Sequence, residues 1–278
     1  IDFSIGNDYV NIRPFGTGGL GELFEAHKRG LDVDVIIKRT KSEFTGKVDE
    51  TREADILKNI NHQFLPRIYD IIFGSDGYIY TIMDKIGGMD LKKYIMQYGP
   101  VKQDKAHKWA SQLCEVAEYL HSQNPPIIHC DIKPGNIMIT PDENICLIDF
   151  NASYIMYEKN QLFASPGFAA PEQYIVKPVS SAQAYTGAAN FDMTTELASA
   201  GNDGVHISKA TDIYAIGATM YFMLTGRSPE KSTEAVTPIT AYKTGVNKYI
   251  NDIILRAMQK EPARRFCDAA SMLQALSS

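Results

Sequence analysis

Residues 127–150 constrain the fold and the chemistry of this chain more than any other stretch. Asp131 and Asn136 stand five positions apart within it. Pro134 and Gly135 lie between them and interrupt any helix, so neither side chain is committed to a helix face. We therefore expect the carboxylate and the amide to point into one site.

A β-hairpin is expected to follow this loop. Apolar runs at 137–139 and 145–148 flank a polar turn at 140–144, a pattern typical of two short antiparallel strands. The return strand leads to Asp149, which the hairpin brings beside Asn136. Taken alone, the stretch also fits an ordinary hairpin with a polar loop, because Asp and Asn are common turn residues.

The loop and the hairpin carry the groups that phosphoryl transfer requires. Asn136 and Asp149 offer the hard oxygen atoms that hold magnesium. Asp131 can orient an attacking hydroxyl, and Lys133 can offset charge on the moving phosphoryl group. The segments His-Cys-Asp-Ile-Lys-Pro-Gly-Asn and Asp-Phe-Asn resemble the catalytic loop and the magnesium motif of the eukaryotic-like (bacterial-type) serine/threonine protein kinases.

The match departs from the family pattern at two positions. Asn151 replaces a glycine, and Cys130 replaces an arginine, which indicates a variant without the usual Arg-Asp pair (non-RD). In many kinases that arginine binds a phosphate on the activation segment, and a thiol cannot do so. Residues 154–164 also contain no Ser or Thr. We therefore expect activity that does not depend on activation-segment phosphorylation.

A glycine-rich turn near the start of the chain separates the alternating runs 9–13 and 22–26. Its spacing also fits the dinucleotide-binding fingerprint, with Asp34 near the place of the acid. That motif opens a helix, however, whereas an alternating strand follows here. The kinase resemblance implies a cradle for phosphates, which glycines allow because no Cβ blocks the backbone N–H groups. Its residues are Gly16, Thr17, Gly18, Gly19 and Gly21.

The resemblance implies a lysine and a glutamate that act as a pair. Lys38, at the end of the third predicted strand, would hold the α and β phosphates of ATP. Glu53, on a helix predicted at 47–60, would pair with Lys38. Glu50 or Asp55 could take the place of Glu53.

An adenine pocket is implied around the linker at 84–88, where glycines mark a change from strand to helix. Met83 would be the gatekeeper, and the backbone of Asp84 and Ile86 would bond the base. Three apolar side chains would sandwich the ring, namely Leu23, Ile36 and Met138. Ile36 replaces the usual small alanine and narrows this pocket.

The second part of the chain is predicted to be mainly helical, because apolar residues recur there at helical spacing. The helices expected from this spacing are 91–98, 102–123, 247–259 and 268–276, and a buried helix at 209–226 is expected because residues 212–217 resemble a kinase helix. Residues 165–172 resemble the substrate-docking loop of kinases. An insertion at about 177–204, rich in Ser, Thr, Ala, Gly and Asn, is expected to be a mobile surface loop or, alternatively, a docking or regulatory element.

Three charged residues in this part are expected to be structural. By resemblance, Asp212 would anchor the backbone of the catalytic loop, and Arg265 would pair with Glu172 in a buried ion pair. His107 and His121 are expected to be ordinary helix residues rather than ligands.

The composition limits the other classes of function. Apolar residues make up 44% of the chain. The net charge is −5, so the chain lacks the basic excess that would indicate nucleic-acid binding. The sequence contains no run of 18 apolar residues, the length needed to span a membrane. Four cysteines without a CxxC pair suggest reduced thiols and a cytoplasmic setting. Because the chain begins at Ile1 without a Met, we expect an excised domain. The oligomeric state stays open.

We therefore expect an α+β, bilobal protein kinase fold across residues 1–278. A small antiparallel β-sheet lobe with one helix would take about residues 1–84, and a larger, mainly helical lobe residues 89–278. The expected activity is Mg²⁺- and ATP-dependent transfer of the γ-phosphoryl group to Ser or Thr of a protein substrate. Lys133, two residues after Asp131, resembles the Ser/Thr class of kinases.

Two other functions are compatible with parts of the sequence. The first is a nucleotide-binding pseudokinase scaffold, which the unusual residues Ile36, Cys130 and Asn151 motivate. The charged and metal-binding positions of the family are all retained, however, which favours an enzyme. The second is phosphoryl transfer to a small molecule, which the docking-loop resemblance at 165–172 disfavours.

Overall fold

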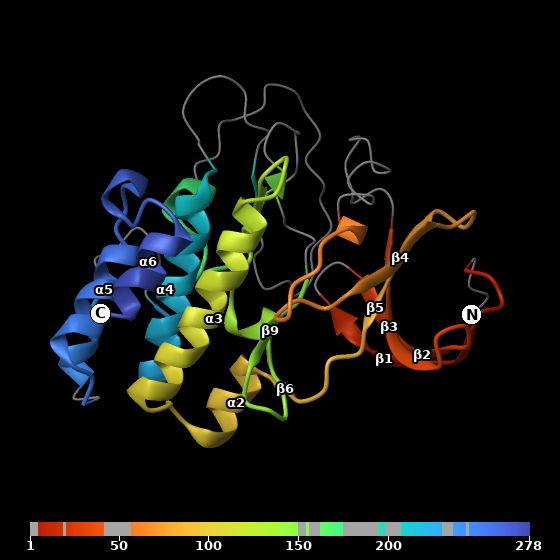
Figure 1. Ribbon diagram of the computed structural model, residues 1–278, viewed down its shortest axis with the longest axis horizontal. Helices are drawn as coiled ribbons and strands as arrows, with labels where there is room; N and C mark the ends of the chain where they lie inside the picture. The colour runs from red at the N-terminus through yellow and green to blue at the C-terminus, as the bar shows by residue number, and fades with distance from the viewer. Residues whose placement is uncertain are drawn as a thin grey trace. The chain divides into compact units, whose positions relative to one another are not determined.

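A computed structural model describes residues 5–18, 21–41, 57–149, 154–155, 162–174, 195–197, 207–229, 236–242 and 245–278. The chain divides into two compact units, residues 1–87 and 88–278. The first unit is built on a β-sheet, and the described part of the second is mainly helical (Figure 1).

The sheet of the first unit has five antiparallel strands in the order β1-β2-β3-β5-β4. The strands are β1 (Tyr9–Gly18), β2 (Gly21–Lys28), β3 (Val33–Lys41), β4 (Ile68–Phe73) and β5 (Tyr78–Asp84). The strands are rich in apolar side chains, and successive residues point to opposite faces of the sheet. The buried face carries Phe24, Ala26, Val35, Ile37, Tyr80 and Ile82. The sequence predicts a hairpin here, with strands at 68–73 and 78–83 around the turn 74–77, and β4 and β5 confirm it within one residue.

The glycine-rich segment is more regular than predicted. Gly16 pairs with Leu23, and Gly18 with Gly21, so residues 16–18 belong to β1 and not to the turn. The prediction was wrong here because the antiparallel ladder continues up to a very short connection. The strand β2, and no helix, follows the glycines, which excludes the dinucleotide-binding alternative.

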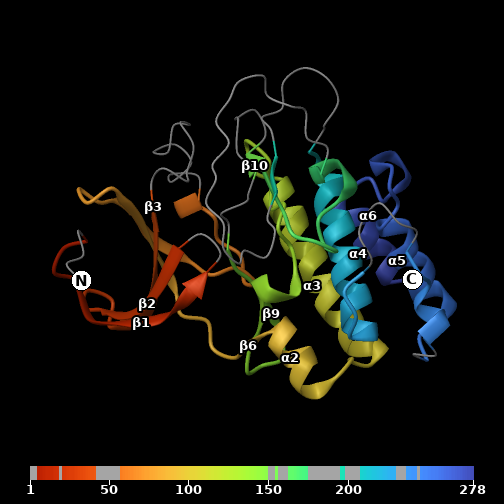
Figure 2. The ribbon, with the colours of Figure 1, turned by 180° about the vertical axis from the view of Figure 1, so that it is seen from behind.

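The helices of the second unit lie within a few residues of their predicted bounds. They are α2 (Leu91–Tyr98), α3 (Gln103–His121), α4 (Lys209–Thr225), α5 (Lys248–Ala257) and α6 (Ala269–Leu276). Helices α3 and α4 lie side by side in both views (Figure 1 and Figure 2). Every residue of α4 from Ala210 to Leu224 is buried. No helix within the described ranges is long and apolar enough to cross a membrane.

Short strands and 3-10 turns complete the second unit. The strands are β6 (Met89–Asp90), β7 (Ile127–Ile128), β8 (Ile137–Ile139), β9 (Ile145–Leu147), β10 (Tyr154–Ile155), β11 (Leu162–Ala164) and β12 (Thr195–Leu197). The 3-10 turns are η2 (Pro134–Asn136), η3 (Pro171–Tyr174), η4 (Ile239–Tyr242) and η5 (Pro262–Arg264). The strand β12, which pairs with β11, lies inside the predicted insertion, where no strand was expected.

Candidate active site

The catalytic-loop residues 129–136 are held between two small sheets. Strand β7, which pairs with β10, leads into the loop, and the β8–β9 hairpin follows it. The backbone N–H of Ile148 donates to the carbonyl of Asn136 at 2.8 Å. This contact places Asp149 beside Asn136, so the predicted hairpin and its return are confirmed.

The carboxylate of Asp131 lies among three polar side chains. Lys133 Nζ contacts Asp131 Oδ2 at 2.9 Å, and Asn136 Nδ2 donates to the same oxygen at 2.8 Å. The hydroxyl of Ser165 donates to Asp131 Oδ1 at 2.6 Å and accepts from Lys133 Nζ at 2.8 Å. The loop therefore brings a carboxylate and an ammonium group to one serine hydroxyl.

The donor atoms at the end of the hairpin suit magnesium. The amide nitrogen of Asn136 is directed at Asp131, so the amide oxygen faces the other way. Asp149, beside it, has φ 71°, a left-handed conformation that residues with a side chain seldom adopt. Among the described residues, no three His, Cys, Asp or Glu side chains gather as a metal site. One amide and one carboxylate would suit Mg²⁺, which would take its other ligands from phosphate oxygens and water.

Asp212, on α4, anchors the catalytic loop as predicted. Its carboxylate accepts from the backbone N–H groups of His129 at 2.8 Å and Cys130 at 2.9 Å. His121 Nε2 contacts the same carboxylate at 2.8 Å. Burial alone would raise the pKa of Asp212, but the bonds from His121 and the loop outweigh it and hold this pKa below its usual value. Burial lowers the pKa of His129 and keeps its ring neutral.

His121 is also part of this anchor. It is buried at the end of α3 and bonded to Asp212, whereas an ordinary helix residue was expected. The sequence does indicate that His121 is buried, because it follows Ala117 by four residues on the apolar face of the helix. A histidine on such a face needs a polar partner.

Several predicted nucleotide-binding residues share one face of the sheet in the first unit. Leu23 lies opposite Lys38, and Ile36 lies opposite Met83, in neighbouring antiparallel pairs. Opposed residues of an antiparallel pair point to the same side, and residues two apart do so as well. All four side chains therefore lie on the face opposite Ile37 and the core, and Lys38 and Ile36 are largely buried there.

Asp84 is already engaged at the end of β5. Its backbone N–H donates to the carbonyl of Arg67 at 3.0 Å, and its carboxylate accepts from Arg67 N at 2.9 Å and Tyr69 Oη at 2.6 Å. A backbone bond from Asp84 to a base would therefore use its carbonyl. Ile86, in the same unit, and Met138, on β8 of the second unit, are both partly exposed.

Comparisons with known proteins agree with this geometry. The family model described as protein kinase domain matches residues 9–274. The chain belongs to the protein kinase domain family. The kinase domain of PknI from Mycobacterium tuberculosis, a solved structure, aligns over 99% of both chains with a TM-score of 0.71 at 18% identity, which shows the same fold.

The curated relatives of this kinase domain include bacterial enzymes. A probable serine/threonine-protein kinase of Clostridium acetobutylicum is 27% identical over 99% of this chain and 40% of its own length. The serine/threonine-protein kinase PrkC of Bacillus subtilis is 28% identical over 96% of this chain and 40% of its own length. The chain thus spans about 40% of these relatives, and it is a eukaryotic-like serine/threonine protein kinase domain.

Part of the predicted site lies outside the described residues. The residues outside the described ranges include Glu53, Gly19, Asn151 and most of the predicted helix 47–60. Thr17 and Gly18 are described in their backbone only, as the end of β1. For these residues the assignments stay predictions.

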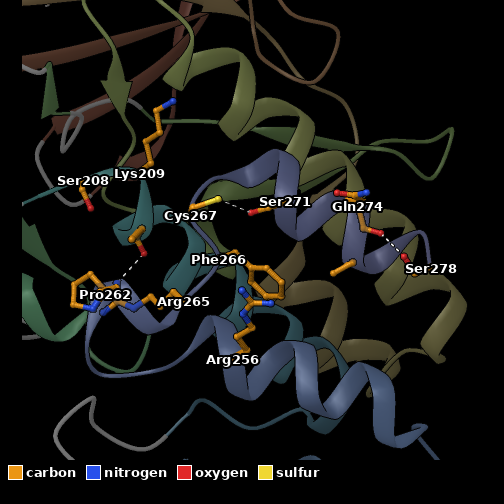
Figure 3. A pocket seen from close by; sticks show the side chains of 13 residues that line it. Ser208, Lys209, Arg256, Pro262, Arg265, Phe266, Cys267, Ser271, Gln274 and Ser278 are labelled. Carbon is orange, nitrogen blue, oxygen red and sulfur yellow. Dashed lines mark hydrogen bonds between the residues drawn. The ribbon is translucent and has the colours of Figure 1, made fainter.

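The kinase domain also has a cavity of about 910 Å³ in its second unit, away from the catalytic loop (Figure 3). Its lining comes from the start of α4, from α5 and η5, and from α6. Arg256 lies against the ring of Phe266, with 4.1 Å from its guanidinium carbon to the ring centre. None of the predicted catalytic or nucleotide-binding residues lines this cavity, so it is not the candidate active site.

Gly21 and Gly16 are expected to respond differently to alanine. A Cβ on Gly21 would lie 2.4 Å from the carbonyl oxygen of Arg39, whereas a Cβ on Gly16 would meet nothing within 4 Å. Gly21→Ala should therefore destabilise the first unit by about 1–3 kcal/mol, through overpacking, and Gly16→Ala by less than about 1 kcal/mol. Thermal unfolding of both variants checks this. Equal losses would show that β2 can shift away from β3.

Proposed function

We propose that this domain transfers the γ-phosphoryl group of Mg²⁺-bound ATP to serine or threonine hydroxyls of a protein substrate. The observation that carries the proposal is the contact of the Ser165 hydroxyl with both Asp131 and Lys133. A carboxylate that accepts the proton of a hydroxyl, and a cation at its oxygen, are what orient an alcohol for attack on phosphorus. An acceptor serine of a substrate would make the same contacts.

The catalytic-loop residues have distinct roles in this proposal. Asp131 orients the acceptor hydroxyl and takes its proton, and Lys133 stabilises charge on the transferred group. Asn136 and Asp149 hold the metal. Magnesium, when bound, supplies positive charge at the phosphate oxygens. In the first unit, Lys38 holds the α and β phosphates and Glu53 orients Lys38.

The remaining residues of the first unit and of β8 bind the rest of ATP in this proposal. The backbone of Gly16, Thr17, Gly18, Gly19 and Gly21 covers the phosphates. The base is bounded by Leu23, Ile36, Met83, Asp84, Ile86 and Met138. The shared sheet face of Leu23, Ile36, Lys38 and Met83 supports this assignment.

We also propose that the enzyme does not need phosphate on its activation segment. The thiol of Cys130 is buried in an apolar cluster with Ile128, Ala169 and Ile207, and unlike the usual arginine it carries no positive charge to bind a phosphate. A cytoplasmic location is proposed from the cysteines, because none of the four forms a disulfide in the described part of the chain, as expected in a reducing compartment.

A transfer assay tests the proposed function. The purified domain is incubated with ATP labelled in the γ position, Mg²⁺ and a basic protein substrate, with and without EDTA and with and without prior phosphatase treatment. Label on Ser or Thr is expected with Mg²⁺, is expected to be lost with EDTA, and is expected to persist after phosphatase. ATP binding without any transfer would favour the scaffold, and loss of transfer after phosphatase would contradict the independence from phosphorylation.

A further inference from the structure

Gln173 connects two loops that are far apart in the sequence. It lies in η3 directly after Glu172, and its side chain is fully buried. Its Oε1 accepts from the backbone N–H of Ala170 at 2.9 Å, and its Nε2 donates to the carbonyl of Cys130 at 2.8 Å. Cys130 directly precedes Asp131. The docking loop, predicted at 165–172, comprises residues 165–174 in the structure. The side-chain amide of Gln173 thus joins the docking loop to the catalytic loop.

Cys130 is held from three directions at this junction. Its backbone N–H donates to Asp212 Oδ1 at 2.9 Å, its carbonyl accepts from Gln173, and its thiol packs against Ala169 and Ile207. Its φ of 63° lies in the left-handed region, which costs free energy for a residue with a side chain. This conformation fixes the peptide plane that leads into Asp131, and the three contacts keep it in place.

We propose that Gln173 is a positioning residue that fastens the docking loop to the catalytic loop and so sets the orientation of Asp131 toward the acceptor hydroxyl. The proposal rests on the proposed function and adds a means of regulation to it. The fastening uses a neutral amide and apolar contacts. It therefore needs no phosphate, and the two loops are joined whenever the domain is folded.

The two ends of the docking loop act together in this arrangement. Ser165, at its start, contacts Asp131 and Lys133, and Gln173, at its end, holds the carbonyl next to Asp131. Tyr174 Oη also donates to the carbonyl of Ser165 at 3.2 Å, which closes the loop on itself. Loss of the Gln173 bond should therefore change how a protein substrate is held, and should not change how ATP is held.

Gln173→Glu removes the bond that the amide donates to the Cys130 carbonyl. Glutamate has the same size and still accepts from Ala170. Because burial raises the pKa of a carboxyl group, the variant is assayed over a pH series, and where the group is ionised the carboxylate cannot donate to a carbonyl. We expect kcat/KM for the protein substrate to fall about tenfold or more, through a lower kcat because Asp131 is no longer held in place and through a higher KM because the docking loop is released. The KM for ATP should stay within about twofold of the wild-type value.

Gln112→Glu is the matched control. Gln112 is also buried in the second unit, where its Nε2 donates to Asn144 Oδ1 at 2.8 Å and its Oε1 accepts from Ile145 N at 3.0 Å. The same substitution there removes the same kind of bond away from the docking loop. Both variants should lose thermal stability, but only Gln173→Glu should raise the KM for the protein substrate. Equal KM values in the two variants would overturn the proposal.

Hydrogen exchange measures the fastening without any need for activity. Peptides that cover residues 129–136 and 165–174 should exchange about tenfold faster in Gln173→Glu than in the wild type or in Gln112→Glu. Phosphatase treatment of the wild type should leave this protection unchanged. Unchanged exchange in Gln173→Glu would refute the fastening even if the kinase is active. A wild type that protects both loops but transfers no phosphate would refute the proposed function alone.

Discussion

Asp131→Asn is expected to lower kcat for phosphoryl transfer by about 10²–10⁴-fold, the range that a positioned general base contributes. Asparagine has the same shape, and its amide can still bond Ser165 and Asn136. It carries no negative charge to face Lys133, which lies 2.9 Å from the carboxylate in the wild type, and it cannot take up the proton of the acceptor hydroxyl. The variant should therefore have a lower kcat but the same midpoint of thermal unfolding as the wild type.

The measurement compares kcat at saturating ATP with the midpoint of thermal unfolding. Asp142→Asn is the control, because Asp142 is exposed in the turn between β8 and β9 and the same substitution there should change neither quantity. If Asp131→Asn kept kcat within about threefold of the wild-type value, another group would be the base and the assignment of Asp131 would be wrong.

The parts of the structure that follow a local rule were predictable from the sequence. In the second unit, α2, α3, α5 and α6 show an apolar spacing of about 3.6 residues, and β4 and β5 are short apolar runs on either side of a Gly-Ser-Asp-Gly turn, so their bounds were found within a few residues. The catalytic-loop hairpin was predicted for the same reason. Asp212 and the pair of Glu172 with Arg265 were placed correctly by resemblance, because each stands at a recognisable motif.

Contacts between distant polar side chains were not predictable in this way. Gln173 and Cys130 are 43 residues apart, and His121 and Asp212 are 91 apart, so no local pattern links either pair. Positive φ angles gave no signal either, because Cys130 and Asp149 are not glycines. Strand β12 has three residues, too few for a period to be recognised, and only its partner β11 defines it.

Arg265→Met is expected to destabilise the second unit by about 3–5 kcal/mol, because it leaves the carboxylate of Glu172 buried without its cation. The guanidinium makes two bonds of 2.7 Å to that carboxylate. Its other donor bonds go to the carbonyls of Gln259, Ala210 and Lys260. All five N–H groups of the arginine are thus used, so methionine removes five bonds at once.

Substitution of the other partner, Glu172→Gln, should lower the free energy of unfolding by less than Arg265→Met does. Glu172→Gln keeps the shape of the side chain and an acceptor oxygen for Arg265, and Arg265 keeps its three bonds to carbonyls. Thr211, which donates to Glu172 Oε1 at 2.9 Å, can still donate to an amide oxygen. We therefore expect an order of destabilisation in which Arg265→Met exceeds Glu172→Gln, whereas a pair that depended on its charges alone would give two equal losses.

Arg264→Met provides the matched control for Arg265→Met. The neighbouring Arg264 is exposed, and its contact with Glu261 at 3.7 Å joins two solvated side chains. Such surface pairs contribute at most about 1 kcal/mol, so this variant should unfold close to the wild-type midpoint in urea. Comparable midpoints for Arg264→Met and Arg265→Met would show that the buried pair adds no more than a surface pair. A large gap between them would show that η5 is joined to the docking loop through Glu172, directly beside Gln173.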